Sequence, residues 1–206
     1  AIASDYFSAS RPYLLLGGGG QGMTAARAWS AGYRVVTNLA QLAAISTAST
    51  SPVCGMFGNG SMPYEYDGMA GLPHLSGMTA RALALLENSA GGFFLLVEGG
   101  LIDHAAHAND LARCLPEVIE LSSAVDTALA WANGRTDTLI MILADHETGG
   151  LHVVADNGVG VLPSVTWSTT GHTSTNVTIR AWGALAERLA GALDNTDVHA
   201  VPLADV

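Results

Sequence analysis

The sequence lacks lysine altogether, and its eight basic residues, all arginine, stand against 18 acidic ones. Because binding nucleic acid without sequence preference needs a basic surface, a formal net charge of −10 argues against that class of function. Long apolar runs are also missing, since runs such as 93–97 and 139–144 fall far short of the roughly 20 residues that cross a bilayer. We therefore expect neither a nucleic-acid partner nor a membrane span.

Charged residues and cysteines are scarce as well. Only 13% of the residues are charged and 49% are hydrophobic, which excludes a disordered chain and favours one folded domain over residues 1–206. Cys54 and Cys114 follow no spacing motif, so buried free thiols are favoured over a disulfide between them. The first residues include no basic region and no apolar stretch of signal-peptide length, which is typical of a cytosolic protein or of a mature or truncated form.

Short apolar runs alternate with amphipathic stretches along the chain. This pattern predicts an α/β fold with a mainly parallel sheet flanked by helices. The expected strands are 13–16, 34–37, 53–57, 93–97, 138–144 and 177–182. The expected helices are 39–45, 78–87 with Ser76 as its cap, 105–132 with a kink or restart at Pro116, and 185–193. The run 93–97 is continuously apolar, which is typical of a strand covered on both faces.

Side chains with metal-binding chemistry follow two of these predicted strands. The run 93–97 leads into Glu98, Asp103 and His107, and the run 138–144 leads into Asp145 and His146. Ligands of open α/β sheets bind at the carboxyl ends of the strands, so we expect both groups at one edge of the sheet.

The spacing of Asp103 and His107 predicts half of a zinc site. Residues four apart lie on one face of a helix, and His172 is a candidate third ligand. One carboxylate, two imidazoles and an open position describe a catalytic zinc. Asp145 and His146 are candidates for a second metal, and Glu98, a hard oxygen ligand, suits magnesium.

Simpler interpretations exist for each of these residues. A single Asp-x-x-x-His pair is more often a surface hydrogen bond, and an Asp-His dipeptide after a strand is a common loop. The two groups together favour function, because both follow apolar runs and both are followed by glycine. His104 is interpreted as a supporting or structural residue. Three further histidines have no partner at a useful spacing and are interpreted as surface or core residues: His74, His152 and His199.

Three segments resemble the metal-binding motifs of alkaline phosphatases. They are 98–110 (EGGLIDHAAHAND), 144–151 (ADHETGGL) and 171–173 (GHT), and their order and spacing match that family. The segments 14–19, 31–33, 55–57 and 194–196 are also similar to family sequences, so the whole chain resembles the C-terminal part of an alkaline phosphatase. Leu101 departs from the pattern, because many members carry a polar or basic residue there, which puts contacts with the substrate in doubt.

The resemblance implies the hydrolysis of phosphate monoesters with two zinc ions and one magnesium ion. Asp103, His107 and His172 would bind the first zinc ion, Asp145 and His146 the second, and Glu98 the magnesium ion. The family's nucleophilic serine is not found in this sequence. The resemblance places it in an N-terminal part, together with the remaining aspartate of the second zinc, two magnesium ligands and the arginine that clamps phosphate.

Two other functions remain open at this point. In the first, the chain is a metal-binding fragment or module without catalysis of its own. In the second, it is a phosphodiesterase-type metallohydrolase of the same superfamily. We also expect an uncovered apolar sheet edge, which homo-oligomerisation or a complementing chain with the N-terminal part would cover. The family's usual habitat and the lysine-free composition favour a periplasmic or extracellular location.

Overall fold

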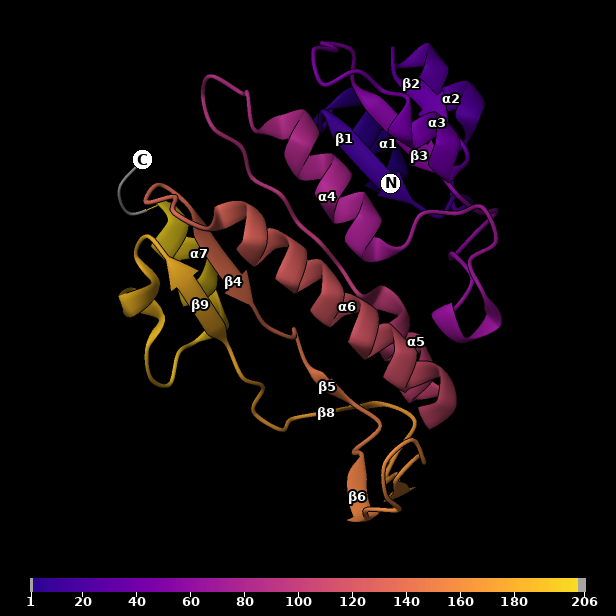
Figure 1. Ribbon diagram of the computed structural model, residues 1–206, viewed down its shortest axis with the longest axis vertical. Coiled ribbons are helices and arrows are strands. Elements are labelled where there is room, and N and C mark those ends of the chain that lie inside the picture. The colour runs from indigo at the N-terminus through magenta and orange to yellow at the C-terminus, as the bar shows by residue number, and fades with distance from the viewer. Residues whose placement is uncertain (1, 204–206) are drawn as a thin grey trace. The chain divides into compact units, whose positions relative to one another are not determined.

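Three parallel strands form the largest sheet of the protein, whose computed structural model describes residues 2–203. Strand β1 (Leu14–Gly17) and strand β2 (Arg34–Val36) both pair with β3 (Val53–Met56), which lies between them (Figure 1). All three were predicted from their apolar runs. The parallel sheet and its helices confirm the predicted α/β class.

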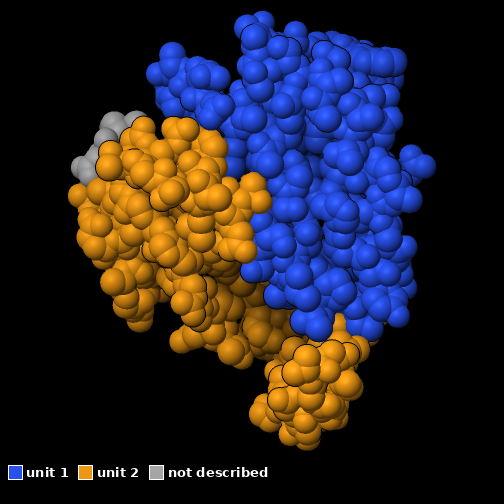
Figure 2. Space-filling view, in the orientation of Figure 1, with its two compact units in different colours: residues 1–102, 112–124 blue, residues 103–111, 125–206 orange. Residues whose placement is uncertain are grey.

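The described residues separate into two compact units, coloured differently in Figure 2. The first comprises the chain up to residue 102 together with 112–124, and the second comprises 103–111 together with the chain from 125 onward. The parallel sheet belongs to the first unit.

Buried clusters cover both faces of the parallel sheet. Successive side chains of a strand point to opposite faces, so each strand contributes to both clusters. On one face Val36 and Val53 pack with Leu42, Phe57 and Leu85. On the other face, Cys54 packs with a second cluster of buried residues, Phe7, Ala28 and Tyr33. Cys54 and Cys114 are both buried and form no disulfide, as predicted.

The helices of the first unit supply these two layers. Helices α1 (Ile2–Ser8) and α2 (Ala25–Ser30) contribute to the Phe7 cluster, and α3 (Leu39–Ala43) and α4 (Leu75–Leu86) to the Phe57 cluster. A short 3-10 helix, η1 (Glu65–Asp67), lies between β3 and α4 in the sequence. Helix α4 begins at Leu75, three residues before the predicted start at 78, because His74 and not Ser76 occupies the N-cap.

The predicted strand 93–97 is wrong. This segment is extended but belongs to no strand, and the side chains of Phe94 and Leu96 are 79% and 75% exposed. An apolar run becomes a strand only where a neighbouring strand accepts and donates its backbone hydrogen bonds. The sheet of the first unit consists of β1, β3 and β2, and the segment pairs with none of them.

Two helices replace the single one predicted over 105–132. Helix α5 (Gly100–His107) ends before Asn109, which adopts the left-handed conformation (φ 54°), and α6 (Leu111–Ala132) follows. The break therefore falls before Pro116, which lies within α6. No helix among residues 2–203 combines the length and the apolar character that crossing a bilayer needs.

Antiparallel strand pairs characterise the second unit. They are β4 (Leu139–Ile142) with β9 (Arg180–Gly183), β5 (Glu147–Thr148) with β8 (His172–Thr173), and β6 (His152–Ala155) with β7 (Ser164–Thr166). The predicted final helix 185–193 is wrong: only the 3-10 turn η2 (Ala186–Leu189) forms, after Leu185 in a left-handed conformation, and α7 (Asn195–Leu203) follows.

Candidate metal centre

Two distant segments of the second unit are brought together by the two-residue ladder between β5 and β8. In this ladder Glu147 faces Thr173, and Thr148 faces His172. His172 thereby lies beside the residues that follow β4, although more than twenty positions separate them in the sequence. The end of α5 contributes Asp103 and His107, one helical turn apart.

Asp103, His107 and His172 converge on one point. The Nε2 atom of His107 lies 3.4 Å from Asp103 Oδ1 and 3.1 Å from His172 Nε2. The His172 Nε2 atom lies 3.5 Å from the same carboxylate oxygen. One ligand atom from each residue therefore falls within 4.8 Å of the other two, which is the arrangement that the sequence predicted for these three residues.

The tautomer of His107 follows from its second hydrogen bond. Its Nδ1 atom lies 2.5 Å from the carbonyl oxygen of Thr170, and a carbonyl can only accept, so Nδ1 carries the proton. The unprotonated Nε2 then points at His172 and Asp103. Histidines that bind metals are commonly oriented by a bond of this kind from the other ring nitrogen.

The donor set fits a zinc ion. Two imidazole nitrogens 3.1 Å apart, with a carboxylate oxygen beside them, need a shared proton or a cation between them, because two lone pairs repel. Nitrogen and carboxylate donors are among the ligands that zinc takes, and three protein ligands leave the fourth position open. The three side chains are between one third and one half exposed, so that position is accessible to solvent.

Asp145 and His146 lie next to this cluster. The carboxylate of Asp145 is 87% exposed, and its Oδ2 atom lies 3.3 Å from His146 Nε2. The His146 ring stacks on the His172 ring, with centroids 3.5 Å apart and an interplanar angle of 22°. The two predicted groups of ligands in the second unit are therefore neighbours.

Thr148, which the sequence analysis missed, connects the two groups. Its hydroxyl donates to Asp103 Oδ1 at 2.6 Å and lies 3.1 Å from His146 Nδ1. A hydroxyl has one proton to donate, so His146 donates from Nδ1, and in the neutral ring its Nε2, on the side of Asp145, is then the nitrogen that can bind a cation. Alternation in an extended segment places residues 146 and 148 on one face, and this signal was present in the sequence.

These contacts affect the pKa of the Asp103 carboxyl. Partial burial raises its pKa, but the hydrogen bond from Thr148 and the positive charges that the three neighbouring histidines carry when protonated lower it by more, so the net shift is downward. Asp103 is therefore held as the carboxylate, which is the form that binds a cation.

Glu147 holds the ladder from the opposite side. Its carboxylate accepts hydrogen bonds from the Thr173 hydroxyl and, at 2.8 Å, from the backbone amide of Gly150. The Thr173 bond is the largest cause of a lowered pKa for Glu147, and it outweighs desolvation. Glu147 thus fixes the strand that carries His172, and it is a second supporting residue that the sequence analysis missed.

Gly149 allows the backbone to turn within the centre. Its φ is 90°, and a Cβ atom there would lie 2.6 Å from the Trp167 ring. Its amide donates to the carbonyl of Gly171 at 2.9 Å, and its carbonyl accepts from Ser168 at 3.0 Å and Thr169 at 3.2 Å. No side chain fits at this position without displacing the segment before His172.

The remaining predicted residues lie elsewhere. Glu98 is exposed and belongs to the first unit, so its assignment to magnesium still depends on the sequence resemblance alone. His104 is exposed on α5, and His152 and His199 are exposed, as interpreted from the sequence. His74 forms a contact with Glu65 in the first unit.

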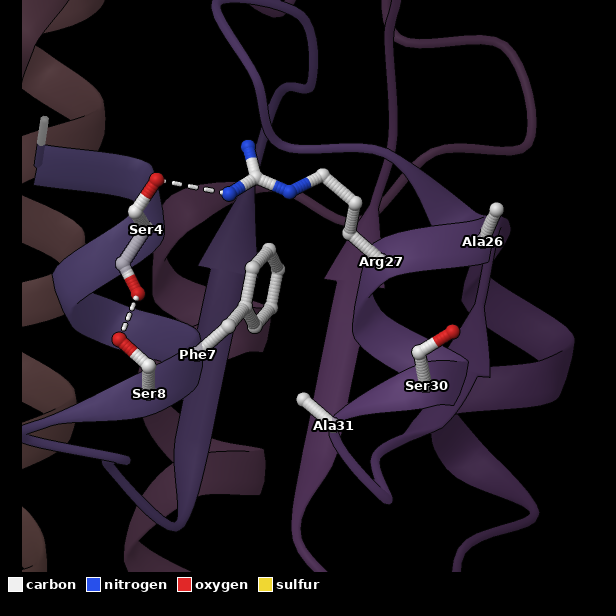
Figure 3. Close-up of a pocket in the computed structure, with 7 residues that line it drawn as sticks. All are labelled: Ser4, Phe7, Ser8, Ala26, Arg27, Ser30 and Ala31. Atoms are coloured by element: carbon white, nitrogen blue, oxygen red, sulfur yellow. Dashed lines mark hydrogen bonds between the residues drawn. The ribbon is translucent and has the colours of Figure 1, made fainter.

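A pocket of about 390 Å³ lies elsewhere, between α1 and α2 in the first unit (Figure 3). Its charged residue, Arg27, donates to Ser4 Oγ and to the Gly22 carbonyl, both at 2.8 Å, and its guanidinium lies over the Phe7 ring. These contacts connect α1 to α2. None of the predicted site residues lines this pocket.

Comparison with known proteins identifies a family for this chain. The family model for alkaline phosphatases matches residues 18–164. Alkaline phosphatase H of Pseudomonas aeruginosa is 30% identical over 241 residues, covering 92% of this chain and 51% of that protein. Streptomycin-6-phosphate phosphatase of Streptomyces griseus is 32% identical over 247 residues, covering 92% of this chain and 55% of that protein. The chain thus spans about half the length of these relatives.

Solved structures agree with the sequence comparison. The cold-active alkaline phosphatase of a psychrophilic Shewanella matches 98% of this chain and 67% of its own, with a TM-score of 0.86 and 26% identity. A variant of TAB5 alkaline phosphatase with magnesium bound in its M3 site matches with a TM-score of 0.81 and 25% identity, over 98% of this chain and 62% of its own. Because the family model covers more than half of the sequence, the chain belongs to the alkaline phosphatase family.

Proposed function

We propose that this protein takes part in the hydrolysis of phosphate monoesters at a metal centre containing Asp103, His107 and His172. The observation that carries the proposal is the convergence of two imidazole nitrogens and one carboxylate within 4.8 Å of one another. Membership in the alkaline phosphatase family supports the reaction. The name of the Streptomyces griseus relative, streptomycin-6-phosphate phosphatase, refers to a monoester substrate of that protein.

In this proposal Asp103, His107 and His172 hold one zinc ion, Asp145 and His146 contribute to a second, and Glu98 holds magnesium. Zinc bound there would supply Lewis-acid stabilisation of the oxygen that attacks phosphorus and of the oxygen that leaves it. Two hydrogen bonds within the protein orient the imidazole ligands. The Thr170 carbonyl holds the proton of His107 on Nδ1, and the Thr148 hydroxyl does the same for His146.

The nucleophile of the reaction is a separate part of the proposal. The resemblance implies a serine in an N-terminal part of the family's length, and no segment like it is found in this sequence. We infer that a segment or chain with this serine completes the centre. The extended segment 93–97 supports pairing with another strand, because Phe94 and Leu96 expose their apolar side chains.

We also propose how the protein assembles and where it is located. Homo-oligomerisation or a complementing chain would cover segment 93–97, and the single domain predicted over 1–206 would then include both compact units. A periplasmic or extracellular location is proposed from the resemblance and the lysine-free composition.

Turnover of p-nitrophenyl phosphate with added zinc and magnesium tests the function, with His172→Ala measured in parallel. His152→Ala is the matched control, because His152 is also exposed but lies on the β6–β7 hairpin. Activity that is lost in His172→Ala and kept in His152→Ala supports the proposal. Equal activity in all three indicates a contaminating phosphatase.

The same assay distinguishes the other two functions. Faster turnover of bis-p-nitrophenyl phosphate than of the monoester would assign the protein to diester hydrolysis instead. No turnover of either ester, with zinc bound in the parent and lost in His172→Ala, would make this chain a metal-binding part without catalysis of its own.

A further inference from the structure

A second cluster of possible metal ligands lies in the first unit. It consists of Glu65 in η1, His74 at the N-cap of α4, and Glu120 in α6. One ligand atom from each of these residues lies within 4.8 Å of the other two. Among the described residues, only this cluster and the Asp103 cluster meet that criterion.

The cluster is fixed in place by hydrogen bonds from the backbone at η1 and at the start of α4. Glu120 Oε1 accepts from the backbone amide of Ser76 at 2.6 Å, in the first turn of α4. Glu117, one helical turn earlier on α6, accepts from the backbone amide of Glu65 at 2.7 Å. The segment 65–76 is therefore attached at both ends to the same face of α6.

Negative charge in this region exceeds positive charge. The carboxylates of Glu65 and Glu120 lie at a single imidazole, that of His74, and the Glu117 carboxylate accepts from the backbone amide of Glu65. Glu117 is only 8% exposed, and burial is the main cause of its raised pKa; the hydrogen bond from the Glu65 backbone amide opposes this shift, and the charges of Glu65 and Glu120 add to it. Arg113, the preceding cation on α6, pairs with Asp67 at 2.9 Å and lies over two tyrosine rings.

The geometry of His74 allows an ion to bind. Its Nδ1 atom lies 2.8 Å from Glu65 Oε2, and its side chain is 52% exposed. The imidazole can give up its Nδ1 proton and use this nitrogen as a ligand, because its Nε2 atom can carry the proton instead. A cation would then replace the hydrogen-bonded proton between the two side chains.

We propose that Glu65, His74 and Glu120 bind a divalent first-row metal ion, Zn²⁺ foremost, at a site separate from the Asp103 centre. One imidazole and two carboxylates are a mixed nitrogen and oxygen donor set, which favours zinc over magnesium or calcium. Three protein ligands leave one position for water, which the exposure of His74 permits. The ion joins η1, the start of α4 and α6, so its role is to hold the segment 65–76 against α6.

The competing explanation is a hydrogen-bonded Glu65–His74 pair with no metal. The zinc content of untagged protein distinguishes the two, measured by elemental analysis after dialysis against micromolar zinc. The measurement is made in a His107→Ala/His172→Ala background, which removes two ligands of the Asp103 centre. The result therefore does not depend on whether the proposed phosphatase function is right.

We expect His74→Ala to remove one equivalent of zinc per chain from this background. Glu120→Gln should weaken the same equivalent at least tenfold, since even the loss of a residue that only supports a ligand costs about 10–100-fold in metal affinity. Glutamine keeps an oxygen that accepts from Ser76, so this variant preserves the attachment of α4. His152→Ala is the matched control and should bind as much zinc as the background.

Thermal unfolding provides a second readout. Zinc should raise the melting temperature of the background protein and of His152→Ala, but not that of His74→Ala, because an ion that binds only the folded state stabilises it. Equal zinc content and equal zinc-induced stabilisation with and without His74 would overturn the proposal. A loss of zinc in His152→Ala as large as in His74→Ala would also overturn it.

Discussion

Thr148→Val tests whether one hydroxyl organises both groups of ligands in the candidate metal centre. The valine side chain has nearly the shape of threonine but cannot donate to Asp103 Oδ1, which accepts from Thr148 at 2.6 Å, or accept from His146 Nδ1 at 3.1 Å. The change removes hydrogen bonding with little change in volume. We expect weaker zinc binding without loss of the fold.

The size of the effect can be worked out from the contact. A hydrogen bond to a charged group contributes about 1.5–3 kcal/mol. The Asp103 side chain is 36% exposed, so water partly replaces the lost bond and the lower end applies. Since about 1.4 kcal/mol corresponds to a factor of ten, zinc affinity should fall about tenfold, the low end of the 10–100-fold range for supporting residues.

Competition with a chromophoric zinc chelator measures this affinity directly. Thr148→Ser retains a hydroxyl and should bind zinc nearly as tightly as the parent. Thr166→Val makes the same replacement on exposed strand β7 and should leave the affinity unchanged. In an Asp103→Ala background Thr148→Val should cost much less than in the parent, because the two residues act together. Zinc affinity within twofold of the parent in Thr148→Val, or an equal loss in Thr148→Ser, would refute the reasoning.

Two further predictions concern the same region. Gly149→Ala should lower the free energy of unfolding by about 1–3 kcal/mol, since it forces a Cβ against Trp167 at a φ of 90°. Urea unfolding followed by tryptophan fluorescence measures this loss. Unchanged stability would mean that the turn relaxes freely. The pKa of Glu147 is lowered in the folded state, so its contribution to stability is present above its ordinary pKa of 4.5 and is lost as the pH falls through its folded value. Glu147→Gln should therefore lower stability at pH 7 and reduce the dependence of stability on pH below about 4.5, whereas parallel curves for the two proteins would contradict the linkage.

The sequence pattern was sufficient to predict a strand where the fold also provides that segment with a partner strand and covering helices. The runs 13–16, 34–37 and 53–57 match strands β1, β2 and β3 within one residue at each end, because each has neighbouring strands and covering helices in the same unit. The run 93–97 is more apolar than these but has no pairing strand among the described residues, so its apolar character did not produce a strand. Periodicity reports what a segment can bury and not whether a partner is present.

The candidate site was predictable only in part for a similar reason. Asp103 and His107 are four residues apart on a helix, and that spacing fixes their relation. The place of His172 depends on the β5–β8 ladder, and two-residue strands carry almost no sequence signal. Glu65, His74 and Glu120 come from three elements far apart in the chain, so no spacing could connect them. The single domain predicted over 1–206 stays a prediction.

The ladder between β5 and β8 also makes the position of His172 independent of the length of the chain that connects the two strands. Thr148 and His172 face each other, and the chain from 149 to 171, including the β6–β7 hairpin, leaves and returns at this pair (Figure 1). The entropy of closing a loop grows only with the logarithm of its length, so doubling this excursion would cost about 0.6 kcal/mol. The tip of the hairpin can therefore lengthen, shorten or take up a new sequence while His172 keeps its place, which makes it a site open to evolutionary or engineered insertion.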